Sequence, residues 1–121
     1  MKQFDDKDRE MIQCLRSLGI DRRAAQTLTY LASVPSATAR QIDHGAGLRQ
    51  PEVSLGLKYL RSLGWIEESR RRGNTGRLLT MYQLRVPVSD VVALLEKKAE
   101  TNLAISKQLV SQVKRWFEAK A

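Results

Sequence analysis

The chain has 121 residues, 42% of them hydrophobic, which suits one domain with a real core and leaves little room for a second. Its 21 Lys and Arg residues outnumber 13 Asp and Glu residues, and the net charge of +8 favours a polyanionic partner, most commonly nucleic acid. Cys14 is the only cysteine and His44 the only histidine, which excludes an intramolecular disulfide and a zinc site of Cys and His ligands.

The start of the chain, MKQFDDKDRE, is charged and lacks the apolar core of a signal peptide. No stretch approaches the roughly 20 apolar residues of a membrane span. A single cysteine fits a reducing compartment. We therefore expect a cytoplasmic protein with no membrane partner.

The first third of the chain predicts two amphipathic helices. The first covers Asp5 to Leu18 and is followed by Gly19, a residue that commonly ends helices. Cys14 on this helix is expected to be buried, and a redox-sensing thiol is the alternative. Asp21 can cap the second helix, which runs to about Val34. Its apolar stripe has helical spacing: Ala24, Ala25, Leu28, Leu31 and Ala32.

Two further helices, separated by a glycine turn, are predicted between residues 38 and 63. Thr38 can cap a short helix from Ala39 to about His44, which is followed by a tight turn at residues 45–48. Gln50 caps or precedes the next helix, which has Pro51 at its first position and runs to Leu63. Its buried face is predicted to consist of Val53, Leu57 and Leu60.

A β-hairpin is predicted at about residues 65–85. Residues 65–68 and 78–84 favour strands, and the basic segment SRRRGNTGR at residues 69–77 is expected to form the loop between them. The loop is longer than a two-residue turn, so its tip is expected to be mobile.

A long final helix is predicted from about residue 88 to Lys120, beginning near Pro87. It would span more than about 40 Å, longer than a small domain is wide. Apolar residues and one asparagine recur along it every three or four positions: Val92, Leu95, Ala99, Asn102, Ile105, Leu109, Val113 and Trp116. We expect this stripe to pair with a second copy, parallel or antiparallel, with Asn102 fixing the register. The alternative is that the helix packs across the first two helices of its own chain.

The order of helix, turn, helix and basic hairpin predicts a mostly α-helical winged helix-turn-helix protein with a small β-hairpin wing. Residues 1–87 would form a DNA-binding domain, and residues 88–121 a dimerisation helix. Four residues of the 50–63 helix are expected to contact bases in the major groove: Gln50, Glu52, Ser54 and Leu55. Gln can pair with adenine, Glu can accept from cytosine N4, and Leu can contact a thymine methyl. A merely solvated polar face is the alternative.

Backbone and wing contacts are expected from a larger set of basic and polar residues: Thr38, Arg49, Lys58, Tyr59, Arg70, Arg71, Arg72, Asn74 and Arg77. Arginine binds phosphate bidentately and also enters narrow minor grooves. The segment from Arg49 to Arg85 has eight cations against three acids, so the positive charge is concentrated on these elements.

Two stretches resemble known proteins. Residues 37–68, ATARQIDHGAGLRQPEVSLGLKYLRSLGWIEE, resemble the helix-turn-helix of archaeal and bacterial winged-helix regulators, particularly the TrmB-like and MarR-like groups. Residues 70–84, RRRGNTGRLLTMYQL, are similar to their wing. The resemblance covers about Asp21 to Leu84 and implies a homodimer that places two recognition helices in successive major grooves. Asp43, Glu52 and Leu55 depart from the residue types common in these groups.

The sequence therefore predicts a homodimeric, sequence-specific regulator of transcription that binds double-stranded DNA. A winged-helix adaptor that docks on other proteins is the alternative, but it would not need four arginines around its wing. There is no phosphate-binding loop, no His-based triad and no paired carboxylate site, so an enzyme is not expected. No cofactor, metal or effector site is recognisable from the residues.

Overall fold

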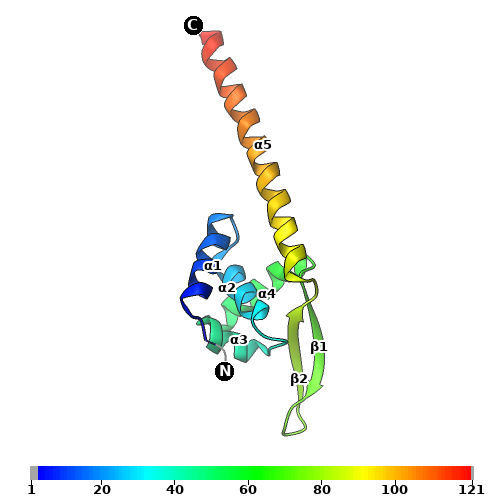
Figure 1. The fold of residues 1–121 in the computed structure, drawn as a ribbon. Coiled ribbons are helices and arrows are strands. Elements are labelled where there is room, and N and C mark those ends of the chain that lie inside the picture. The colour runs from blue at the N-terminus through cyan, green and yellow to red at the C-terminus, as the bar shows by residue number, and fades with distance from the viewer. Residues whose placement is uncertain (1–2, 121) are drawn as a thin grey trace. The chain divides into compact units, whose positions relative to one another are not determined.

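The structure, a computed structural model, describes residues 3–120. The chain divides into one unit that ends at Val88, called here the winged unit, and a second that begins at Ser89. The winged unit contains helices and a two-stranded antiparallel sheet, and the second unit is one unbroken helix (Figure 1). The elements in chain order are α1 (Asp6–Ser17), α2 (Arg22–Ala32), α3 (Ala39–Ala46), α4 (Gln50–Ser62), β1 (Ile66–Arg72), β2 (Leu78–Leu84) and α5 (Val88–Lys120).

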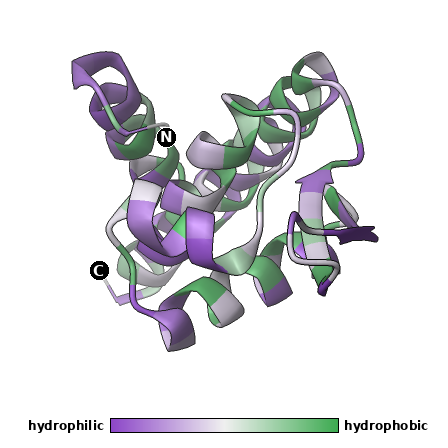
Figure 2. Cartoon of the chain, turned by 90° about the horizontal axis from the view of Figure 1, so that it is seen from below, coloured by the Kyte–Doolittle hydropathy of each residue, from purple (hydrophilic) through white to green (hydrophobic). Residues whose placement is uncertain are grey.

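Helix α2 is the centre of the winged unit, since it contacts α1, α3, α4 and β2. Seven of its eleven residues are buried, and its side chains supply much of the core. The helices of this unit change from hydrophobic to hydrophilic around their circumference (Figure 2). The predicted apolar stripe of α2 is confirmed except at Ala32, which is exposed because it is the last helical residue.

Local capping chemistry sets the start of the early helices; the cap predicted for α2 is confirmed, whereas Asp5, predicted as the first residue of the first helix, is instead its N-cap. Asp5 begins α1 with a capping box, in which its carboxylate accepts from the N–H of Asp8 at 2.8 Å and the Asp8 carboxylate accepts from the N–H of Asp5. The carboxylate of Asp21 caps α2 by accepting from the N–H of Arg23 at 3.1 Å. Gly19 follows α1 with a φ of +94°, a left-handed conformation that favours glycine.

Cys14 is exposed, so the prediction that it is buried is wrong. The residue of α1 that reaches the core is its neighbour Leu15. Successive helical positions point about 100° apart, so Cys14 lies off the narrow face that packs on α2.

Three predicted boundaries also need correction. Gly45 and Ala46 belong to α3, so only Gly47 to Arg49 separate it from α4. Arg49 is the N-cap of α4, which puts Pro51 at the second helical position, where its missing N–H is equally harmless. Helix α2 ends at Ala32, two residues before the predicted end.

The hairpin is longer than predicted, because residues 69–72 belong to β1 and not to the loop. Ser69 pairs with Met81 and Arg72 with Leu78, which leaves residues 73–77 as the tip. The sheet also pairs with the chain before α3, through two hydrogen bonds of 2.9 and 2.7 Å between the backbones of Ala37 and Tyr82. This third backbone segment holds the base of the wing against the helix-turn-helix.

A candidate nucleic-acid interface

Helix α3 and the turn after it form the first half of the candidate interface. Thr38 and Gln41 close a capping box, with Thr38 Oγ1 accepting from the N–H of Gln41 at 3.1 Å and the Gln41 amide oxygen accepting in return at 2.9 Å. Thr38, expected to contact the DNA backbone, therefore lies at the start of α3 and is half-buried. Gly47 ends α3 with a φ of +67°, and the next residue, Leu48, is buried. This turn lets α4 follow α3 as a helix-turn-helix.

Glu52 anchors the first turn of α4, a role that was not predicted for it. Its carboxylate accepts from the backbone N–H of Arg49 at 3.1 Å and forms an ion pair with Arg22 of α2. The Arg49 N–H and the Arg22 guanidinium lower the pKa of Glu52, because both favour the charged carboxylate. A base contact by Glu52 would have to compete with these interactions.

Further residues predicted to contact bases or the DNA backbone lie on the outward face of α4 and at its N-cap, Arg49. Val53, Leu57 and Leu60 are buried as predicted, and Gly56 is buried beside them. Ser54, Lys58 and Arg49 are exposed, Tyr59 is half-buried, and Leu55 has 49% of its surface exposed. Because Leu55 is so exposed, it contributes little to the core. Its side chain is available for an apolar contact, such as one with a thymine methyl group.

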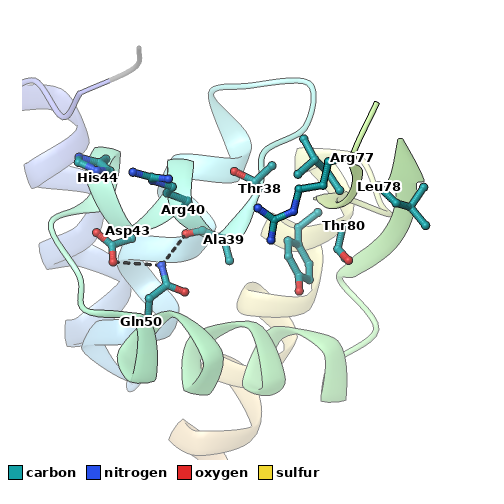
Figure 3. A pocket seen from close by; sticks show the side chains of 11 residues that line it. Thr38, Ala39, Arg40, Asp43, His44, Gln50, Arg77, Leu78 and Thr80 are labelled. Carbon is teal, nitrogen blue, oxygen red and sulfur yellow. Dashed lines mark hydrogen bonds between the residues drawn. The ribbon is translucent and has the colours of Figure 1, made fainter. Parts of the chain in front are cut away.

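An open cleft of about 600 Å³ lies between α3, the start of α4 and β2 (Figure 3). Helix α3 contributes Arg40, Asp43 and His44, and Arg77 projects into the cleft from the wing side (Figure 3). Gln50 lines it from the first turn of α4. Arg40 was not among the predicted contacts, although its i, i+3, i+4 spacing with Asp43 and His44 places all three on one helical face.

The wing arginines are held in different ways. Arg70, Arg71 and Arg72 lie in β1 and are exposed, and Arg71 faces the opposite side of the strand from the other two. The Arg71 guanidinium donates to Ser36 Oγ at 3.2 Å, and that of Arg72 donates to the Gly76 carbonyl at 2.9 Å.

The tip of the wing is short and defined by backbone hydrogen bonds. The Gly73 N–H donates to the Arg77 carbonyl at 2.7 Å, and the Gly76 N–H donates to the Gly73 carbonyl at 3.0 Å. Asn74 and Arg77 are exposed there.

The positive charge of this region is largely unneutralised. Of the eight cations between Arg49 and Arg85, only Arg61 forms an ion pair with a described residue, and its partner is Glu68 of β1. Two of the three acids in the same segment, Glu52 and Glu68, are themselves paired with arginines. Helix α4 and the wing therefore carry a surplus of positive charge toward solvent.

Residues 3–120 contain neither a metal-binding cluster nor a membrane-spanning helix. No three His, Cys, Asp or Glu side chains in this range lie close enough together to hold a metal ion. None of the helices in the same range is long and apolar enough to cross a membrane.

Comparison with known proteins finds similarity in structure alone. No family model and no curated protein matches the chain. A possible transcriptional regulator from Methanosarcina mazei Go1 is 14% identical, with a TM-score of 0.60 over 89% of this chain and 87% of that one. A MarR-family transcriptional regulator from Silicibacter pomeroyi is 16% identical, with a TM-score of 0.52 over 78% and 62% of the two chains.

A mutant of MepR from S. aureus is 22% identical, with a TM-score of 0.52 over 88% of this chain and 76% of that one. Identities this low establish the fold and nothing finer. This chain has the winged helix-turn-helix fold, which it shares with transcriptional regulators that include a member of the MarR family.

Proposed function

We propose that this protein is a sequence-specific transcription regulator that binds double-stranded DNA as a homodimer. The observation that carries the proposal is the surplus of unpaired cations on α4 and the wing, on a fold whose similar structures are described as transcriptional regulators. In this proposal α4 enters the major groove, and the arginines of β1 and the wing tip contact the phosphate backbone or the minor groove.

The roles within this surface divide by chemistry. Arg49, Lys58 and the wing arginines supply sequence-independent affinity, because they are exposed cations that release counterions from DNA. Gln50, Ser54 and Leu55 supply sequence choice, because they are exposed on the helix that enters the groove. Glu52 contributes mainly by holding the first turn of α4 in place.

The homodimer is proposed from the character of α5. This helix has 33 residues, about 50 Å in length, and Val91 is its only buried residue among those described. Side chains of its apolar face have about half of their surface exposed: Val92, Ile105, Leu109, Val113 and Trp116. An apolar stripe of this length favours burial against a second copy of the same helix. Leu95, which is half-buried, and Ala99 and Asn102 complete the face.

The deciding experiment is binding to mixed-sequence duplex DNA, measured by fluorescence anisotropy between about 50 and 200 mM salt. The proposal expects binding at low salt and a steep log–log loss of affinity that reports several released counterions. The absence of measurable DNA binding by micromolar protein at low salt would refute the proposal. Such a result would instead favour a winged-helix adaptor that recognises another protein.

A further inference from the structure

Gln50 and Asp43 form a polar pair across the turn of the helix-turn-helix. Gln50 is the first residue of α4 and Asp43 lies in α3. The Gln50 amide nitrogen lies 3.1 Å from Asp43 Oδ2 and 3.4 Å from the backbone carbonyl oxygen of Ala39 (Figure 3). Both partners are oxygen atoms that only accept hydrogen bonds.

These partners determine the orientation of the Gln50 side-chain amide. A glutamine side chain has two N–H donors on its nitrogen and one acceptor oxygen. With the nitrogen toward Asp43 and Ala39, both donors are used. The reverse orientation would bring the amide oxygen against a carboxylate and a carbonyl, and would lose both hydrogen bonds.

The consequence is that Gln50 presents an acceptor and no spare donor. Its amide oxygen accepts no hydrogen bond from the part of the chain that the structure describes, and its side chain is exposed. A free glutamine makes two hydrogen bonds with adenine: its N–H donates to adenine N7, and its amide oxygen accepts from the N6 amino group. Gln50 can make only the second of these bonds while its amide stays on Asp43.

In the major groove, amino groups are displayed by adenine at N6 and by cytosine at N4, whereas guanine and thymine present acceptor oxygens. We propose that Gln50 is a specificity-determining residue that selects a base with an amino group, adenine or cytosine, and that Asp43 is the positioning residue that imposes this choice. The inference rests on the proposed DNA binding of α4. It revises the expectation that Gln50 recognises adenine through two hydrogen bonds.

The test is selection of binding sites from random duplexes by the full chain and four variants. Wild-type protein should select adenine or cytosine over guanine and thymine at one position, by about fivefold to tenfold for one hydrogen bond. Gln50→Ala should lose the selection at that position alone. Asp43→Ala frees the amide to rotate and to present its N–H donors, so the same position should lose its preference or change to a base that presents an acceptor, guanine or thymine.

Asp43→Asn is the matched control, because an asparagine oxygen can still accept from the Gln50 amide while the negative charge is gone. It should keep the base preference and raise affinity for all duplexes alike. In the double variant, Asp43→Ala should change no preference beyond that of Gln50→Ala, since Asp43 acts through Gln50.

The outcomes separate the two proposals. If wild-type protein does not bind duplexes at all, the proposed function fails and this inference fails with it. If the protein binds but Asp43→Ala retains the wild-type preference that Gln50→Ala removes, DNA binding stands and the positioning role of Asp43 is overturned. A guanine or thymine preference at the position that depends on Gln50 would also overturn it.

Discussion

Gly56 of α4 lies directly against Thr27 of α2. A Cβ atom at position 56 would come within 2.7 Å of Thr27 Oγ1 and 2.8 Å of the backbone carbonyl oxygen of Arg23. The Thr27 hydroxyl is itself held by a 2.8 Å hydrogen bond to that carbonyl. The absence of a side chain at Gly56 therefore sets how closely the proposed recognition helix approaches the central helix of the winged unit.

Gly56→Ala is expected to destabilise the protein. Alanine would gain about 1 kcal/mol of helix propensity, but overpacking against backbone that cannot move costs typically about 1–3 kcal/mol. Urea unfolding followed by circular dichroism should show the net loss. Ser54→Ala, on the exposed face of the same helix, is the control and should not destabilise. A Gly56→Ala protein as stable as wild type would show that α4 can move away from α2 at little cost.

Thr29→Val is expected to stabilise the protein. Thr29 has only 1% of its surface exposed, and its hydroxyl has no hydrogen-bond partner among the described residues. Replacing an unsatisfied buried hydroxyl with a methyl group of the same shape should add about 1 kcal/mol to the free energy of unfolding. Thr27→Val is the matched control, because its hydroxyl has a partner in the Arg23 carbonyl, and it should bring no gain. Equal effects of the two substitutions would contradict this prediction.

The ion pair of Glu52 predicts a pH-dependent contribution to stability. The pKa of Glu52 is lowered in the folded protein by the Arg49 N–H and by Arg22. The stabilisation is therefore present above the unfolded carboxyl pKa of 4.5 and is lost as pH falls through the lower folded value.

Thermal unfolding measured from pH 7 to pH 3 should show that Glu52→Gln is less stable than wild type at neutral pH. The difference in stability between the two proteins should become smaller as the pH approaches 3. Glu10→Gln, exposed on α1, should differ little from wild type throughout. A gap between Glu52→Gln and wild type that stays constant with pH would mean that the charge of Glu52 is not what stabilises α4.

Removing two wing arginines should weaken DNA binding for every sequence alike. In the double variant Arg71→Ala with Arg72→Ala, the log–log salt slope should become shallower by up to about two released counterions. Anisotropy titrations with two unrelated duplexes would measure both effects. Leu55→Ala should instead change relative affinities between duplexes and leave the slope unchanged. Reversed behaviour of the two variants would refute the division of roles between wing and helix.

Charges placed on the apolar face of α5 should dissociate the proposed dimer. Leu109→Lys with Val113→Lys puts two cations where about half of each apolar side chain is exposed in the single chain. Sedimentation velocity should show a dimer for wild type and a monomer for this variant. Ser111→Lys, exposed on the opposite face of the helix, should leave the dimer intact. A variant that still sediments as a dimer would exclude this face of α5 as the interface.

The fold was largely predictable because its signals are local. Asp21 and Thr38 cap helices through N–H groups two and three residues away, and Gly47 ends α3 through its own backbone conformation. The buried face of α4 follows from the spacing of its apolar residues. The strand identity of residues 69–72 was missed, because a run of serine and arginine gives no local indication of a strand and its pairing partners lie across the hairpin.

By itself, the sequence determined the order of the elements, the helix-turn-helix, the basic wing and the exposed character of Leu55. Only the tertiary structure decided which polar groups are free to act. Glu52 meets Arg22 across 30 residues of sequence, Arg71 meets Ser36 across 35, and Gln50 meets Asp43 across the turn. The physical reason is that caps and helical periodicity depend on neighbours in the chain, whereas these pairs depend on how α2, α3, α4 and the wing pack together.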